Sequence, residues 1–433
     1  MLYTAKSIND PILVMFILGL YVLLSATVRG MAFPIVHHIG AEKAKSGREI
    51  SNVYFSNVFG SALSPILIGF VLLDYLSTES VYFSICILTL LASLICTLPA
   101  LKRNFSPILG VVFTLAAAIT CFVTFKETPN SEKLFYVLSS NSHYENSPPE
   151  VIIENKYGFI QVYNSQDSYS NTPVTYGNNA YDGRINTNVF DPSNGIERVY
   201  FLGTVNPDIE NILVIGLSSG AWVKVLTDLP NVKSIKVIEI NPAYEKLISQ
   251  NDTVKSLLKD PRLEIIYDDG RKWLRKNADG KQFDLVVVNT TWHWRNYSTN
   301  MLSKEFQTLI KSVMKDNAFY YYNSTRSIDA YRTTKEVFPY TYQHHFMVVG
   351  SNAPITVDEN AINERMCAMR DSSTQKLIFN SKEMCNKATS VVLKEPLIPY
   401  EKMSKSGFKQ HTPEVISDNN LIPEYKYGLN SSL

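Results

Sequence analysis

A short stretch in the middle of the chain, Ile212–Gly220 (ILVIGLSSG), narrows the fold more than any other segment. An apolar run, a turn of glycine and serine residues and a helical pattern together predict strand, tight loop and helix. The next apolar run, Ser234–Ile240, predicts a second strand with Glu239 near its end. Small loop residues let backbone N–H groups approach a ligand, and an acid in this position can accept hydrogen bonds from ribose hydroxyls. The pattern therefore predicts a site for an adenosine-containing ligand.

Three further strands, with helices between them, follow this start. The strands are predicted at Leu263–Tyr267, Phe283–Asn289 and Ala318–Tyr322, and the helices at Pro242–Gln250, Arg271–Lys276 and Lys304–Lys315. This alternation predicts an α/β, Rossmann-like domain with a mostly parallel sheet, and ligands bind such sheets at the carboxyl ends of the strands. Gly216, Glu239, Asp269 and Asn289 all fall at such ends. The loop has neither the third glycine of the dinucleotide pattern nor the lysine of a P-loop, which argues against NAD and ATP.

Residues 1–125 have a different, mainly apolar composition. They contain candidate membrane spans at Pro11–Val28, Val53–Leu73, Val81–Leu98 and Pro107–Phe125. Each approaches the roughly 20 apolar residues that cross about 30 Å of hydrocarbon. We therefore expect an α-helical transmembrane region of about four helices, which makes the chain an integral membrane protein.

The charges of the loops bear on the side of the membrane that the rest of the chain occupies. Arg29–Glu49 carries several Lys and Arg residues, the third loop carries Lys102 and Arg103, and Asp74–Ser80 carries none. The positive-inside rule places the first and third loops in the cytoplasm. Four spans would then put the soluble part outside, whereas three spans, without the second segment, would return it to the cytoplasm.

The totals and the cysteines exclude several classes of function. A net charge of +1 gives no basic surface for nucleic acid. Only Cys367 and Cys385 lie in the soluble part, where a disulfide and two free thiols are both compatible with the sequence. No Cys/His cluster has the spacing of a metal site, so we expect no metal.

From about Val151 to Gly350 the chain resembles the spermidine synthase family, the polyamine aminopropyltransferases. The resemblance rests on VIIENKYGFIQVY (151–163), NAYDGRINTN (179–188), IERVYFL (196–202), ILVIGLSSG, VIEINP, the DDG at 268–270 and FDLVVVN, in the family's order. SGREISNVYFSNVFGSALSPILIGFVLL (46–73) is similar to bacterial membrane-fused members. This predicts a transmembrane region (1–125), a linker (126–150), a domain with a class I methyltransferase fold and a small β-rich N-terminal segment (151–350), and a C-terminal extension (351–433).

The resemblance implies a role for each residue of the nucleoside site. The donor would be S-adenosylmethionine or decarboxylated S-adenosylmethionine, and the acceptor an amine or another small molecule. The residues implied in donor binding are Gly216, Leu217, Ser218, Ser219, Gly220, Glu239, Ile240, Asp269 and Gly270. Glu239 would hold the ribose hydroxyls and Asp269 the adenine amino group, while Leu217 and Ile240 would sandwich the adenine. A homodimer is expected from the resemblance alone.

The chain departs from the family pattern at positions that take part in the family's reaction. The family has an Asp after the fourth strand, where this chain has Asn289 in NTTWHW (289–294), and a neutral amide cannot serve as general base. His293 could replace it, or could be a packing residue. Weaker candidates for substrate contacts are Tyr157, Asn186, Tyr200, Trp292 and Trp294. Phe201 and Leu202 stand at the two positions where the family has a His-Glu pair near the binding site of the amine substrate.

Two functions of different class follow. One is a membrane-anchored transferase, similar to the enzymes of polyamine biosynthesis, which transfers an aminopropyl or a methyl group to an acceptor. The other is a non-catalytic or repurposed domain of a membrane envelope protein, which binds a ligand or a partner.

Overall fold

The computed structural model describes residues 11–41, 47–100, 149–164, 170–278, 280–289, 299–324, 327–403 and 412–421, with isolated positions 112, 115, 118 and 119. The chain divides into two compact units, Met1–Phe159 and Ile160–Leu433. The sequence placed this boundary at residue 150 and treated residues 351–433 as an extension, whereas the division falls inside the β-rich segment and keeps those residues with the second unit.

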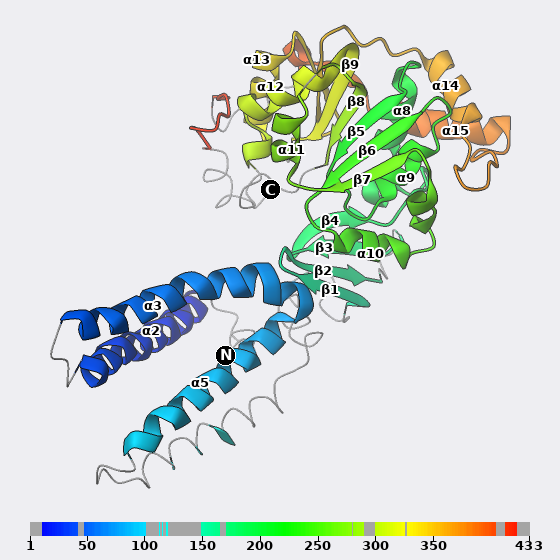
Figure 1. Ribbon diagram of the computed structural model, residues 1–433. Helices are drawn as coiled ribbons and strands as arrows, with labels where there is room; N and C mark the ends of the chain where they lie inside the picture. The colour runs from blue at the N-terminus through cyan, green and yellow to red at the C-terminus, as the bar shows by residue number, and fades with distance from the viewer. Residues whose placement is uncertain are drawn as a thin grey trace. The chain divides into compact units, whose positions relative to one another are not determined.

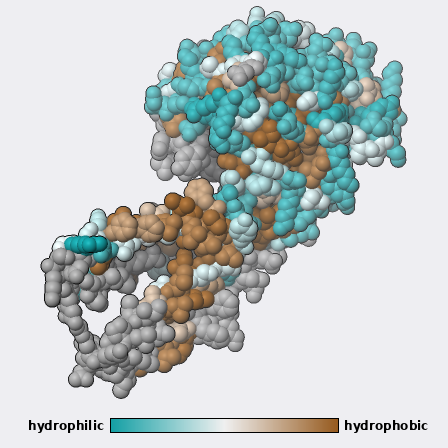
Figure 2. Space-filling view, viewed as in Figure 1, coloured by the Kyte–Doolittle hydropathy of each residue, from teal (hydrophilic) through white to brown (hydrophobic). Residues whose placement is uncertain are grey.

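The first unit consists mainly of apolar helices. Its elements are α2 (Pro11–Ala41), α3 (Gly47–Leu67), the π-helical turn η1 (Ile68–Leu72), α4 (Leu73–Tyr75), α5 (Thr78–Ala100) and the strand β1 (Val151–Asn155). Large apolar side chains such as Phe55, Phe59 and Phe70 are exposed, and Figure 2 shows hydrophobic residues concentrated over α3 and α5. Within the described residues, Ile50–Tyr75 is the helical run that is long and apolar enough to cross a membrane, and Ile12–Leu24 and Thr78–Ala92 are shorter apolar helices.

These helices differ in extent from the predicted spans. The first does not end at Val28 but continues as α2 to Ala41, because Met31–Ala41 is also largely apolar and the helix passes through Pro34. The second continues through η1 and α4 to Tyr75, so Ser64 and Pro65 do not break it. Most of the fourth predicted span lies outside the described residues.

The second unit is built on an eight-stranded sheet with the order β12-β10-β11-β9-β8-β5-β6-β7 (Figure 1). Its strands are β5 (Asn211–Ile215), β6 (Ser234–Glu239), β7 (Leu263–Tyr267), β8 (Phe283–Val288), β9 (Met314–Asn323), β10 (Tyr340–His344), β11 (Met347–Ser351) and β12 (Leu397–Pro399). β5 to β9 are parallel, as predicted, and β11 enters antiparallel between β9 and β10. A parallel sheet of this order, with an antiparallel strand inserted between β9 and β10, has the topology of the class I methyltransferase fold.

Helices cover both faces of this sheet, and successive strand residues alternate between them. In β5, Ile212 and Val214 belong to one buried apolar cluster, and Leu213 and Ile215 belong to the other. The first cluster packs against α8 (Glu197–Val205), α9 (Ala221–Thr227), α14 (Glu359–Ala368) and α15 (Lys382–Val392); the second packs against α11 (Gly270–Lys276), α12 (Lys304–Val313) and α13 (Ile328–Val337). Because both faces are covered, the central strands are continuous apolar runs rather than alternating ones.

A smaller sheet precedes the large one, with the order β1-β2-β3-β4. Its remaining strands are β2 (Gly158–Tyr163), β3 (Val174–Gly177) and β4 (Ala180–Arg184). The short elements of the unit are α10 (Ala243–Ser249) and the 3₁₀ turns η2 (Pro192–Asn194), η3 (Lys255–Lys259), η4 (Thr299–Met301) and η5 (Tyr400–Lys402). The β-rich segment was predicted from the sequence, but the hairpin β10–β11 and the edge strand β12 were not.

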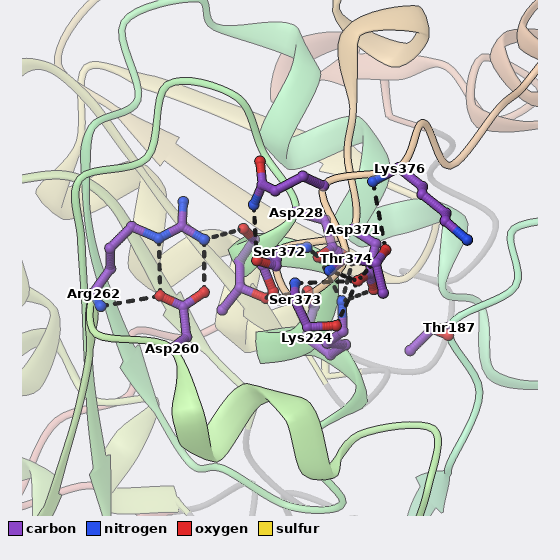
Figure 3. Close-up of polar contacts among 12 residues, drawn as sticks. Thr187, Lys224, Asp228, Asp260, Arg262, Asp371, Ser372, Ser373, Thr374 and Lys376 are labelled. Atoms are coloured by element: carbon purple, nitrogen blue, oxygen red, sulfur yellow. Dashed lines mark hydrogen bonds and ion pairs between the residues drawn. The ribbon is translucent and has the colours of Figure 1, made fainter.

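The C-terminal residues are attached to the domain through a buried ion cluster (Figure 3). Lys224 of α9, 4% exposed, lies 2.5 Å from Asp228 Oδ1 and 2.9 Å from Asp371 Oδ2. Asp371 also accepts hydrogen bonds from Ser373 and Thr374. Burial alone would raise the pKa of Asp371, but hydrogen bonds from Ser373, Lys224 and Thr374 outweigh it and hold that pKa well below its usual value. Beyond this cluster, a disulfide joins Cys367 of α14 to Cys385 of α15.

We expect Lys224→Met to lower the free energy of unfolding of the full chain by about 3–5 kcal/mol, because it leaves the Asp228 carboxylate buried without its partner. Urea unfolding followed by circular dichroism measures the change. The matched control is Lys233→Met, whose pair with Glu210 is solvent-exposed, and it should change stability by less than about 0.5 kcal/mol. Equal stability of Lys224→Met and wild type would show that the cluster does not hold the C-terminal residues.

Candidate functional site

The loop after β5 is held in its path by close backbone contacts. Gly216 has φ +93°, and its N–H donates to Ile238 O at 2.9 Å. A Cβ on Gly216 would lie 3.0 Å from Asn289 O, so the ends of β5 and β8 approach each other as only glycine permits. At Gly220, with φ +79°, a Cβ would meet Ile248 and Leu257 side chains within 3.0 Å. Both glycines are therefore required by the backbone, independently of any ligand.

Glu239 ties this loop to the end of β6. The side chain is 4% exposed, and its two oxygens accept hydrogen bonds from Leu217 N at 2.6 Å and Asn241 N at 2.8 Å. A carboxylate has about four acceptor positions, and the backbone N–H of Ile240 also acts on this group, so capacity for a ligand hydroxyl remains. Burial raises the pKa of Glu239 to about 7 in spite of these backbone hydrogen bonds. The carboxylate therefore changes charge near neutral pH.

The next strand end carries the remaining residues implied in nucleoside binding. Asp269 caps α11 by accepting a hydrogen bond from Lys272 N at 2.7 Å. Gly270 is buried, and a Cβ there would lie 2.5 Å from Ile215 Cγ2, so this glycine has a packing role. Ile240 is 49% exposed beside Glu239. These residues share the carboxyl edge of the sheet with Gly216 and Glu239, as the sequence predicted for parallel strands.

A cavity of about 310 Å³ opens beside the same loop. Its lining includes Leu217, Ser218, Ser219 and Asn289 from the predicted sites, and Tyr181, Asp182, Gly183, Pro192, Ser193, Asn194, Gly195, Glu197, Arg198, Ala221, Trp222, Asn323, His345 and Phe346 in addition. Gly216, Gly220, Glu239, Ile240, Asp269 and Gly270 do not line it. The structure therefore separates the edge at β6 and β7, where the sequence predicted nucleoside binding, from a cavity between β5, β8 and the turn of the β10–β11 hairpin.

Several candidate substrate residues lie elsewhere. Asn186 is buried and supports a turn, because its Oδ1 accepts from Asn188 N at 2.8 Å and its amide donates to Asp191 O at 3.1 Å. Tyr200 is in the core, with its hydroxyl donating to Thr187 O at 2.8 Å. Tyr157 belongs to the first unit and is 40% exposed. His293, Trp292 and Trp294 lie outside the described residues.

The two positions that replace the family's His-Glu pair are also in the core. Phe201 is 2% exposed and Leu202 is fully buried. Phe201 stacks on His344 with ring centroids 4.1 Å apart, and His344 Nδ1 lies 2.9 Å from the Tyr321 hydroxyl. Burial lowers the pKa of His344 to about 3, so this imidazole stays neutral. None of these side chains lines the cavity.

Sequence reasoning missed most of the cavity wall. Glu197 and Arg198 are the charged residues at the start of an otherwise apolar helix, and that pair of charges was the one available signal. Asn323, His345 and Phe346 come from the end of β9 and from the hairpin turn, where no local pattern points to a ligand. Among the described residues, no group of three His, Cys, Asp or Glu side chains could hold a metal ion.

The strand order and the glycine-serine loop define a class I methyltransferase-like α/β domain. Residues 200–349 match the family described as "Spermine/spermidine synthase domain". Over these residues, which are about a third of the chain, the sequence is similar to the spermidine synthase family.

Curated relatives carry the name polyamine aminopropyltransferase. The protein from Alkaliphilus oremlandii is 30% identical over 152 residues, which is 32% of this chain and 52% of the relative. The protein from Thermococcus kodakarensis is 26% identical over 163 residues, 34% of this chain and 56% of the relative. The solved spermidine synthase of Thermotoga maritima is 15% identical with a TM-score of 0.40, covering 56% of this chain and 84% of that one. The chain spans about half the length of these curated relatives.

The raised pKa of Glu239 predicts a pH dependence of nucleoside binding. The ionised carboxylate accepts hydroxyl hydrogen bonds better than the neutral acid, so the affinity of 5′-methylthioadenosine should rise as the pH increases through about 7. Titration calorimetry between pH 6 and 8 measures this, and proton release on binding should accompany it on the acid side. Glu239→Gln should bind more weakly and lose the pH dependence. An unchanged pH profile in that variant would remove Glu239 from the site.

Proposed function

We propose that this chain is a membrane-anchored transferase that binds an S-adenosyl donor at the carboxyl edge of the large sheet. One observation carries the proposal: Glu239, Leu217 N and the Gly216–Gly220 loop form a single hydrogen-bonded unit with spare acceptor capacity for a ribose. The family match over residues 200–349 supports it. Decarboxylated S-adenosylmethionine, the donor that the resemblance implies, and S-adenosylmethionine both present the nucleoside to this edge.

The reaction would take place in the cavity that adjoins the loop. An acceptor atom attacks a carbon bonded to the sulfonium, the C–S bond breaks, and its electron pair stays on sulfur as a neutral thioether. An amine acceptor must also lose a proton, and Asn289, which lines the cavity, cannot take it. Methyl transfer depends more on alignment of the acceptor with the sulfonium than on a strong base. The amide at Asn289 therefore favours methyl transfer, or an acceptor that arrives deprotonated.

The nucleoside product identifies the reaction. Purified full chain with a radiolabelled donor and a panel of acceptors, including putrescine, should release S-adenosylhomocysteine if a methyl group moves and 5′-methylthioadenosine if an aminopropyl group moves. Glu239→Ala should lower turnover by at least about tenfold, because it removes the ribose acceptor. Tight nucleoside binding without product from any acceptor would contradict the transferase and support a binding function.

We infer membrane anchoring from the apolar helices and from contacts within the first unit. Asp74, near the end of the second apolar helix, lies 2.7 Å from Lys156 Nζ, and Thr78 N, at the start of α5, donates to Glu154 at 2.8 Å. Thus the loop Asp74–Ser80 contacts the residues that lead into the second unit. Four spans would place that loop and the second unit on one side of the membrane, in agreement with these contacts.

We expect cysteines introduced at Ser77 and at Ser432 to react together with a membrane-impermeant maleimide in intact cells, or to be protected together. Permeabilised cells should label both, and the unsubstituted chain gives the background. Labelling of one position without the other would contradict the four-span arrangement.

The side of the membrane on which the labelled cysteines lie also distinguishes between two candidate functions. The disulfide between Cys367 and Cys385 favours an oxidising compartment, and the loop Asp74–Ser80 has no Lys or Arg. An outside location would favour the second candidate, a repurposed domain that binds a ligand or a partner in the cell envelope. A cytoplasmic location would give the transferase access to its donor.

A further inference from the structure

A buried guanidinium forms part of the cavity floor. Arg198, in the first turn of α8, is 7% exposed, and its Cζ lies 4.3 Å from the centre of the Phe346 ring and 5.2 Å from that of Trp222. Its nitrogens donate to Gly195 O at 2.8 Å, to Asn194 O at 3.0 Å and to Met347 Sδ at 3.2 Å. A guanidinium has more N–H groups than these three contacts use, and a thioether is a weak acceptor. Arg198 therefore retains donor capacity inside the cavity.

The charge of Arg198 has no carboxylate partner at ion-pair distance among the described residues. A buried charge without a counter-charge is costly, and burial lowers the pKa of Arg198 accordingly. The charge of the neighbouring Glu197 acts on Arg198 and opposes the effect of burial on its pKa, but the two side chains form no ion pair, because consecutive residues of a helix point in different directions. An anion bound in the cavity would offset this cost.

Glu197 has the opposite imbalance, an acceptor oxygen that lacks a donor among the described residues. It lines the same cavity, and among the described residues its buried Oε2 accepts no hydrogen bond. The other acid of the cavity, Asp182, is engaged with the hydroxyl of Tyr244. The cavity thus holds one cation and one acceptor oxygen that are not satisfied by each other, with Ser218 and Asn289 as neutral polar neighbours.

A purely structural role for Arg198 would account for the hydrogen bonds to Gly195 and Asn194, which fasten the turn η2 to α8. That role does not account for the unpartnered oxygen of Glu197 beside it. Nor does it suit a diamine acceptor, for which a cavity should present carboxylates without a fixed cation. Opposite charges held apart in one cavity match a ligand that carries both charges.

We propose that this cavity binds a zwitterionic amino-acid group, with its carboxylate on Arg198 and its ammonium on Glu197. The inference deepens the proposed function, because the amino-acid end of S-adenosylmethionine has both charges while decarboxylated S-adenosylmethionine lacks the carboxylate. A free α-amino acid has the same chemistry and would suit the repurposed domain. Arg198 would thus select the carboxylated form of the donor.

Equilibrium binding to the purified full chain tests this with four ligands: S-adenosylmethionine, its decarboxylated form, 5′-methylthioadenosine and methionine. The wild type should bind S-adenosylmethionine about 10- to 100-fold more tightly than the decarboxylated form, as expected for charge-assisted hydrogen bonds. Arg198→Gln should abolish that difference and leave 5′-methylthioadenosine binding unchanged. Glu197→Gln should weaken both forms of the donor, since both carry the ammonium, and should also leave 5′-methylthioadenosine unchanged.

Arg332→Gln and Glu336→Gln are the matched controls, because this ion pair lies on α13 outside the cavity, and neither change should affect binding. If Arg198→Gln does not fold, judged by thermal unfolding, Arg198→Lys replaces it, since an ammonium keeps the charge but loses the planar fork. Equal affinity of the wild type for both donor forms, or equal loss of all ligands in the Arg198 variant, would overturn the inference and leave the proposed function standing. Arg198-dependent binding of methionine without any nucleoside binding would support the cavity and overturn the transferase. Binding of none of the four ligands would overturn both.

Discussion

The hydrogen bond from Leu217 N to Glu239, 2.6 Å long, is the contact on which the architecture of the site depends. It closes the loop after β5 against the end of β6, while Gly216 brings the same loop against Asn289 at the end of β8. Because neighbouring parallel strands end at the same edge, one buried carboxylate fixes the loop that adjoins both the predicted nucleoside site and the cavity. The cost of burying that carboxylate appears in its raised pKa.

The elements that the sequence predicted well are those with a strong local pattern. β5, β6 and β8 are apolar runs bounded by turn residues, and burial on both faces of the sheet leaves little ambiguity in such runs. β7 is an apolar run as well, although it lies at the edge of the sheet and is only partly buried. The hairpin β10–β11 was missed because Tyr340–Ser351 mixes polar and apolar residues, and its turn depends on His345 at φ +58°, a conformation that the sequence does not announce. The cavity residues in this turn, His345 and Phe346, were therefore not predicted either.

Packing by distant residues also explains why the predicted substrate residues do not line the cavity. Tyr200 was a weak candidate for a substrate contact, and Phe201 and Leu202 were noted as replacements of a family His-Glu pair, but α8 turns all three side chains into the core under α14 and α15. One turn earlier, Arg198 lies at the cavity, in a position to which the family motif assigns no role. Alignment thus located the helix but not the face that it presents, since the face depends on packing from residues beyond position 350.

That dependence gives the C-terminal residues a part in the site. α14 and α15 cover α8, the disulfide joins them to each other, and the ion cluster around Lys224 attaches Asp371 to α9, the helix that begins at the glycine-serine loop. The helix with Arg198 and the loop with Ser218 are therefore both held from the outer side by one C-terminal layer. If this layer is loosened, the positions of the cavity residues should change before the position of Glu239 does. Glu239 is held by backbone groups at the edge of the sheet itself.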